Sequence, residues 1–115
     1  MKKIVTLITI SVFASSICFA QSQMEMNQQA YADYSKADAE MAKTYKEVQK
    51  ITTNAKEKKL LLDAQRAWIK FKEAHCKSII AVHEGGSIQP LIYSTCLLQL
   101  TEERTKQLKE YLKGY

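Results

Sequence analysis

The feature that most constrains this chain is a stretch of residues 1–82 that contains neither glycine nor proline. These two residue types form most tight turns, so their absence argues against a sandwich or barrel with frequent turns. Hydrophobic residues make up 46% of the chain and charged residues 25%, which also excludes collagen-like and generally disordered chains. We therefore predict an all-α fold, an antiparallel bundle of about three long helices in one domain.

The first 20 residues have the layout of a secretory signal peptide. Lys2 and Lys3 precede an apolar run over residues 4–14, and small residues lead to Ala20. We expect cleavage after Ala20 and a single periplasmic or secreted domain over residues 21–115. A transmembrane helix is the first alternative, but the run is short and no basic cluster stops transfer. Lipid modification of Cys18 is the second, although Ile17 before it is not small.

Export changes the expected chemistry of the cysteines. Without Cys18 the domain keeps Cys76 and Cys96, an even number in an oxidising compartment, so we predict one disulfide between them. The alternative is a metal site that uses His75, Cys76, His83 and Cys96. Adjacent residues of a helix point about 100° apart, so His75 and Cys76 cannot easily face one ion. The sequence also has no pair of cysteines with the C-x-x-C spacing of many metal sites. We expect neither a metal nor another cofactor.

Charge narrows the class of partner. The full chain carries +5, and loss of Lys2 and Lys3 leaves +3. Lysines and glutamates interleave along the chain, which is typical of solvated helix faces and not of nucleic-acid binding. The one dense patch, Lys56, Lys58 and Lys59 around Glu57, makes an anionic envelope polymer an alternative partner.

Three helices can be placed from periodicity and capping residues. The first begins at a capping box, Ser22 with Glu25, and ends near Ile51. Asn54 caps the second, and the third begins at Ser87 with Pro90 in its first turn and ends at Gly114. The expected core stripe of the first helix is Asn27, Tyr31, Tyr34, Asp38, Met41, Tyr45 and Val48. That of the second is Leu60, Leu61, Ala64, Ala67, Trp68, Phe71, His75 and Ile79. That of the third is Leu91 or Ile92, Cys96, Leu100, Arg104, Leu108, Tyr111 and Leu112.

Catalytic chemistry is not indicated by the sequence. His83 and Ser87 lie close together in the segment that joins the second and third helices, but only Glu84 could orient the histidine. Gly85 and Gly86 before the third helix could present free amides to an anion. We therefore expect a protein that binds a partner and is not an enzyme.

Three ordered motifs resemble the LprI-like lysozyme inhibitor family. Residues 64–76 are similar to its motif Q-x-x-W-x-x-[FY]-[RK]-x-x-x-C, and residues 96–108 to its ending C-x-x-x-[LM]-T-x-x-R-x-x-x-L. Residues 85–88 resemble the family's loop, and residues 24–30, 37–41 and Tyr45 its first helix. The motif residues to which a structural role is assigned are Gln65, Trp68, Phe71, Thr101 and Arg104. Gln29 stands where the family often has a cysteine of a second disulfide.

The resemblance implies a small exported helical protein that inhibits lysozyme or another peptidoglycan hydrolase. Animal lysozymes are strongly basic, so a chain of charge +3 gains nothing from overall attraction and must act through a local feature. The best candidate is the braced loop of His83, Glu84, Gly85, Gly86 and Ser87. An envelope interaction or immunity module that binds another periplasmic protein is the alternative function. A homodimer through Tyr31, Tyr34 and Tyr45 would bury leftover apolar area.

Overall fold

The computed structural model describes the backbone of residues 2–114 and the side chains of residues 17–114. Its elements are α1 (Lys2–Ile51), α2 (Ala55–Ile80), the short 3-10 helix η1 (Ala81–His83) and α3 (Gln89–Lys113). No strand occurs in the described chain. The predicted all-α fold with three long helices is therefore confirmed.

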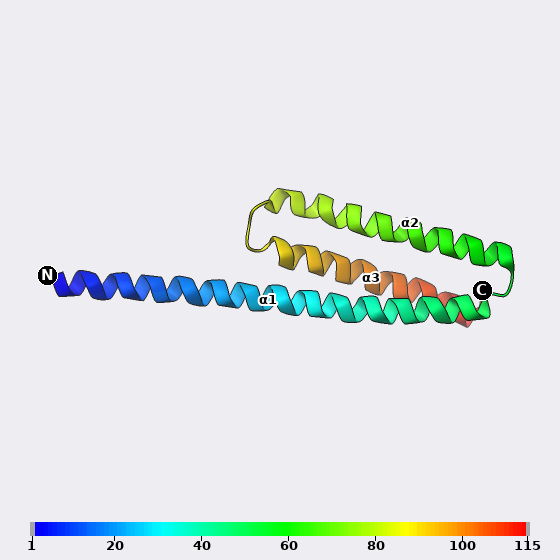
Figure 1. The fold of residues 1–115 in the computed structure, drawn as a ribbon, viewed down its shortest axis with the longest axis horizontal. Helices are drawn as coiled ribbons and strands as arrows, with labels where there is room; N and C mark the ends of the chain where they lie inside the picture. The colour runs from blue at the N-terminus through cyan, green and yellow to red at the C-terminus, as the bar shows by residue number, and fades with distance from the viewer. Residues whose placement is uncertain (1, 115) are drawn as a thin grey trace.

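The helices α2 and α3 form an antiparallel hairpin that lies along the C-terminal half of α1 (Figure 1). The closest helix pair is α1 with α3, while α2 packs mainly against α3. The N-terminal half of α1 continues alone beyond the hairpin, so the molecule measures 82 × 23 × 17 Å. Within the described residues, no helix is both long and apolar enough to span a bilayer.

Several predicted helix ends are confirmed. The helix α1 ends at Ile51, and the Asn54 side chain caps α2 by accepting hydrogen bonds from the amides of Lys56 at 2.9 Å and Glu57 at 3.1 Å. Gly114 ends α3 with φ +81°, a backbone conformation that favours glycine. Pro90 lies in the first turn of α3, where a missing amide costs little.

Two predicted caps are wrong. The helix α1 runs without a break from Lys2 past Ser22, so no helix begins at that serine. Ile88 occupies the cap position of α3, and no side chain bonds to the first turn there. Ser87 instead has its carbonyl bound to α1, because the Asn27 Nδ2 donates to it at 3.1 Å.

The hydrophobic core lies where all three helices meet. Met41 and Val48 of α1, Leu61 of α2 and Leu108 of α3 are buried together, and Tyr45 and Trp68 pack against them. Much of the remaining buried surface of α1 and α3 is small and polar, namely Thr44, Ser94, Thr101 and Thr105. The Thr44 hydroxyl donates to Glu40 O at 2.9 Å within its own helix, so its burial needs no partner from another helix.

The core face of α2 differs from the prediction. Leu60 and Phe71 are 57% and 54% exposed, and His75 and Ile79 are exposed too. The residues that α2 buries are Leu61, Gln65, Lys72 and Cys76. Among the predicted residues, Leu61 and Trp68 do face the core. The buried face of α2 is rotated by about 100° around the helix axis from its most apolar face, which corresponds to a shift of one residue along the sequence.

The other two stripes were predicted more accurately. Met41, Val48, Arg104 and Leu108 are buried as expected, but Tyr31, Tyr111 and Leu112 are exposed. Of the tyrosines considered for a dimer contact, Tyr45 packs against the core and the Tyr34 hydroxyl accepts a hydrogen bond from Lys72 Nζ at 3.0 Å. Neither side chain is therefore a free surface group.

Candidate functional site

The segment between α2 and α3 is an exposed loop at one end of the hairpin. Every residue from Ala81 to Ile88 is exposed, including the five that the sequence analysis selected, His83, Glu84, Gly85, Gly86 and Ser87. Two backbone hydrogen bonds shape it: Gly86 N donates to His83 O at 3.0 Å, and Gln89 N donates to Gly86 O at 3.2 Å. The loop is therefore two consecutive turns.

Both glycines are required by this geometry. Gly85 has φ +77°, a conformation that side chains with a Cβ rarely adopt. Gly86 has little room, because a Cβ added there would lie 3.1 Å from the His83 carbonyl oxygen. The turn thus depends on one glycine for its backbone angle and on the other for close approach.

Two contacts constrain the hairpin that carries the loop. The disulfide Cys76–Cys96 joins α2 to α3 with their Cα atoms 5.7 Å apart, which confirms the predicted pair. On the far side of the turn, Asn27 of α1 donates to Ser87 O, and Gln23 Nε2 holds that asparagine by donating to its Oδ1 at 2.9 Å. The bridge also engages both cysteines of the alternative metal site.

The loop presents hydrogen-bond donors and one carboxylate to solvent. The side chains of His83, Glu84 and Ser87 are exposed. The backbone amides of Gly85 and Ser87 are also available, because they donate no hydrogen bond within the described chain. No hydrogen bond joins His83 to Ser87 in the described chain, so the structure does not assemble a nucleophile and its base there. The arrangement is suited to binding.

A shallow groove separates the loop from α1. Its lining includes Phe19, Met24 and Asn27 from α1 and Gly85 to Ser87 with Pro90 from the loop and α3. Its volume is about 740 Å³. A ligand bound to the loop can therefore also contact the N-terminal part of α1.

A buried polar cluster joins two motif residues beneath the surface. Arg104 of α3, 9% exposed, donates from Nε to Gln65 Oε1 at 3.0 Å. Gln65, 6% exposed, donates in turn to Met41 Sδ at 3.0 Å, so the cluster connects all three helices. Burial lowers the pKa of the Arg104 guanidinium, because the charged form loses hydration. Arg104 Nη2 and the hydroxyls of Tyr45 and Thr101 are buried without a hydrogen-bond partner in the described chain.

The remaining motif residues have different environments. Thr101 is fully buried, and Trp68 is half-buried against the core. Phe71 lies on the surface with its ring stacked on His75, the centroids 5.3 Å apart. The core role expected for Phe71 is therefore wrong.

The burial of Lys72 is not indicated by the interleaved lysines and glutamates, a pattern typical of solvated helix faces. Lys72 is only 4% exposed, and its ammonium group lies 3.0 Å from the Tyr34 hydroxyl and 3.8 Å from Asp38 Oδ1. The same group lies 4.8 Å from the centroid of the Trp68 ring, a cation–π contact. The only sequence signal was its place in the motif, directly after Phe71.

Comparison with known proteins identifies the family. Residues 18–108 match the family described as lysozyme inhibitor LprI. The chain belongs to the LprI family. The buried pair Gln65–Arg104 and the bridge Cys76–Cys96 thus join the two helical motifs by which the family resemblance was drawn.

An uncharacterized protein of Rhizobium meliloti (strain 1021) is similar to this chain. It is 38% identical over 108 residues, an alignment that covers 83% of this chain and 77% of the relative. No solved structure matches this LprI family chain.

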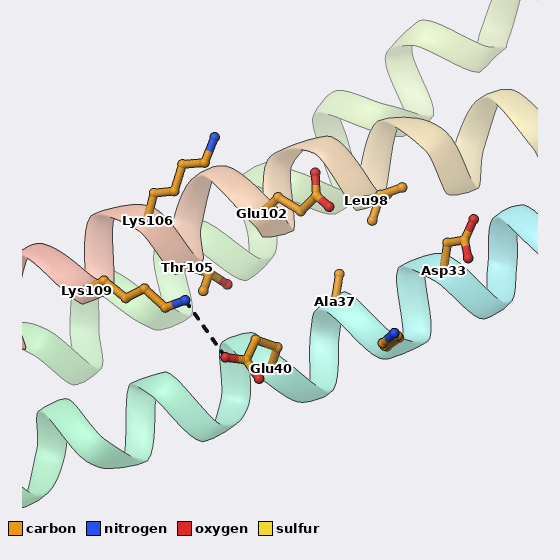
Figure 2. Close-up of a pocket in the computed structure, with 9 residues that line it drawn as sticks. Asp33, Ala37, Glu40, Leu98, Glu102, Thr105, Lys106 and Lys109 are labelled. Carbon is orange, nitrogen blue, oxygen red and sulfur yellow. Dashed lines mark ion pairs between the residues drawn. The ribbon is translucent and has the colours of Figure 1, made fainter.

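Two further grooves of this chain are lined by charged side chains. The first lies between α1 and α3 and carries both signs, with Lys109 Nζ 3.9 Å from Glu40 Oε1 across it and Asp33 farther along (Figure 2). The second lies where α1 ends and α2 begins, and it is lined by Lys46 and Lys50 of α1 together with Lys58 and Lys59 of α2. Only the second groove is dominated by one sign of charge.

Proposed function

We propose that this LprI family chain is an exported, non-enzymatic inhibitor of lysozyme or another peptidoglycan hydrolase, and that it acts through the loop 83–87. Membership of a family described by lysozyme inhibition supports the class of target. The observation that carries the assignment to the loop is its bracing, since a disulfide joins the two helices that carry this exposed turn and Asn27 bonds to Ser87 within it.

Rigidity matters because ordering a flexible loop on binding costs affinity. A turn that is fixed before contact loses little entropy when it enters a cleft. Its donors, namely His83, the Ser87 hydroxyl and the amides of Gly85 and Ser87, suit the paired carboxylates that glycoside hydrolases use for catalysis. The net charge of +3 adds no attraction to a basic lysozyme, so these local contacts supply the affinity.

Removal of a signal peptide would improve access to the loop. Cleavage after Ala20 leaves only six residues of α1 before Asn27, about 9 Å of helix at 1.5 Å per residue. The loop then stands at one tip of the molecule (Figure 1). Phe19 and Ala20, which line the groove beside the loop, leave with the peptide.

Gly86→Trp tests this function directly. The indole must start from a Cβ that lies 3.1 Å from the His83 carbonyl, so it distorts the turn and blocks the tip. We expect inhibition of at least one enzyme in a panel of basic animal lysozyme and bacterial muralytic enzymes to weaken by about tenfold or more. The measurement is lysis of peptidoglycan suspensions at micromolar inhibitor.

Glu103→Trp is the matched control, because it places the same ring on an exposed position of α3 far from the loop. This variant should inhibit like the parent chain, and circular dichroism should show the same helix content for all three proteins. A parent chain that inhibits no enzyme of the panel, or two variants with equal inhibition, would refute the proposal.

The lysine groove favours a second candidate function, binding of an anionic envelope polymer. Lys46, Lys50 and Lys58 converge there without an ion pair among the described residues, while Lys59 is paired with Asp63 at 2.8 Å. Because such binding is electrostatic, we expect the affinity for a phosphate-rich polymer to fall by about tenfold or more between 50 and 300 mM salt. Lys50→Gln/Lys58→Gln should weaken it, and Lys70→Gln/Lys77→Gln, with the same loss of charge, should not. Equal weakening by both pairs, or binding unaffected by salt, would exclude a site in this groove.

A further inference from the structure

The buried guanidinium of Arg104 has no negatively charged partner in the described chain. Its hydrogen bonds go to two uncharged amides, Gln65 Oε1 at 3.0 Å and Gln107 Oε1 at 3.1 Å. The ion pairs among the described residues all use lysines, and none includes Arg104. Arg104 is only 9% exposed, and its lowered pKa reflects the loss of hydration. Buried charges are normally paired, because an unpaired ion loses its hydration without compensation.

Two donor groups at this guanidinium are also without a partner. Arg104 Nη2 and the Tyr45 hydroxyl are both buried, and neither forms a hydrogen bond in the described chain. They share one neighbourhood, because Tyr45 interacts electrostatically with Arg104 and packs against Leu108, one turn after Arg104 on α3. The unpartnered Thr101 hydroxyl lies one turn before Arg104, whereas the guanidinium extends to Gln107 in the turn after it. Buried polar atoms without a partner require an explanation, and a bound ion is one.

We propose that Arg104 and Tyr45 form a binding site for a small monovalent anion such as chloride. The anion accepts hydrogen bonds from Arg104 Nη2 and the Tyr45 hydroxyl, and it supplies the negative charge that the two glutamine amides lack. A water molecule can bond to the same atoms but does not neutralise the guanidinium. A divalent oxyanion would leave an excess negative charge in the core, so the single positive charge favours a monovalent ion.

A groove between α1 and α2 brings solvent to the edge of this site. Tyr45 and Gln65 both line it, and its volume is about 480 Å³. The charged side chains of the groove balance in sign, namely Lys46 and Lys72 against Asp38 and Glu73. The groove therefore has no preference for anions of its own, and the selectivity of the site arises from Arg104.

Thermal denaturation of the full chain at constant ionic strength tests for the anion. Sodium chloride replaces sodium gluconate, whose anion is much larger than chloride. We expect the melting temperature to rise with chloride and then to level off, because binding to the folded state saturates. Chloride at about ten times its dissociation constant favours the folded state about elevenfold, a rise of about 5 °C or more for a domain of this size.

Tyr45→Phe removes the hydroxyl and keeps the ring. In gluconate this variant should melt at or above the temperature of the parent chain, because it loses a buried hydroxyl that has no partner in the described chain. In chloride it should melt below the parent chain, because its affinity for the anion falls by about tenfold or more. Tyr31→Phe is the matched control on the same helix, and since Tyr31 is exposed this variant should respond to chloride like the parent chain.

Broadening of the chloride NMR line measures binding directly. The parent chain should broaden the line, and Arg104→Met should abolish the broadening at a temperature where circular dichroism shows that this variant is folded. Equal broadening by both proteins would assign the chloride to surface lysines and overturn the site. Equal melting temperatures of the parent chain in the two salts, or a parent-like response of Tyr45→Phe to chloride, would overturn it too.

The anion site is independent of the proposed inhibitory loop. Asn27 is the α1 residue that bonds to the loop, and Tyr45 is 18 residues farther along α1, roughly 27 Å of helix. Tyr45→Phe should therefore inhibit hydrolases like the parent chain. Failure of the loop in the inhibition panel leaves the chloride response as expected, and absence of a chloride response leaves the inhibition as expected.

Discussion

Replacement of both bridge cysteines by alanine, Cys76→Ala/Cys96→Ala, is expected to lower the free energy of unfolding by about 3 kcal/mol. The bridge joins positions 20 residues apart. In the chain-entropy account, loss of a disulfide that closes a loop of this size lowers the free energy of the unfolded chain by about 3 kcal/mol, because the open chain has more conformations. For a domain of this length the melting temperature should fall by roughly 12–24 °C, measured by circular dichroism. Alanine is chosen because Cys76 is fully buried, where a serine hydroxyl would need a partner.

Two controls separate the effect of the disulfide on stability from the effect of replacing a cysteine. Cys18→Ser removes the exposed free cysteine and should leave the melting temperature unchanged. A reducing agent should lower the melting temperature of the parent chain toward that of the double variant and should not affect the variant. If reduction leaves the parent chain unaffected although both thiols become free, the bridge contributes little and the packing of α2 on α3 alone holds the hairpin.

The features predicted correctly from sequence depend on local chemistry. The Asn54 cap, the glycine at the end of α3 and the break near Ile51 each follow from one residue and its backbone preferences. The disulfide followed from the number of cysteines and the expected compartment. The loop 83–87 was found for the same reason, because Gly85 and Gly86 lie together in a chain with only three glycines.

The core face of α2 could not be predicted in this way. Periodicity identifies the most apolar face of a helix, and on α2 that face contains Leu60 and Phe71. The buried face is chosen by partners on other helices, since Gln65 bonds to Arg104 and Met41, and Lys72 bonds to Tyr34. Contacts between residues 24 to 39 positions apart leave no periodic signal in a single sequence.

The caps at Ser22 and Ser87 failed for related reasons. A capping box is a local preference, and α1 passes through Ser22 because nothing upstream interrupts the helix. At Ser87 the tertiary contact with Asn27 engages the serine's backbone, and α3 begins two residues later. In both places the wider structure overrides a short motif.

The buried polar cluster leads to the second large effect, from Gln65→Leu. Leucine has a similar size but cannot accept the hydrogen bond from Arg104 Nε, which is 3.0 Å long in the parent chain. The partly desolvated guanidinium would then keep only the hydrogen bond from Nη1 to Gln107, because Nη2 has no hydrogen-bond partner in the described chain. We expect the free energy of unfolding to fall by about 2–3 kcal/mol, measured by urea denaturation.

Gln107→Leu is the matched control for the loss of an amide. Gln107 also accepts a hydrogen bond from Arg104, at 3.1 Å from Nη1, but its own side chain is exposed and water can replace it. This variant should lose no more than about 0.5 kcal/mol. If Gln65→Leu and Gln107→Leu are equally mild, Arg104 reaches solvent and the cluster is not a constraint on the fold.

The double variant Gln65→Leu/Arg104→Met then shows whether the cost arises from the stranded charge. Removing the guanidinium together with its partner leaves no unpaired ion in the core, and replacing both partners of a buried hydrogen bond by apolar groups of the same shape can be nearly neutral or stabilising. We expect the double variant to be within about 1 kcal/mol of the parent chain, above Gln65→Leu alone. Losses that simply add would mean that the two side chains do not act together, and that Gln65 supports the bundle only through Met41.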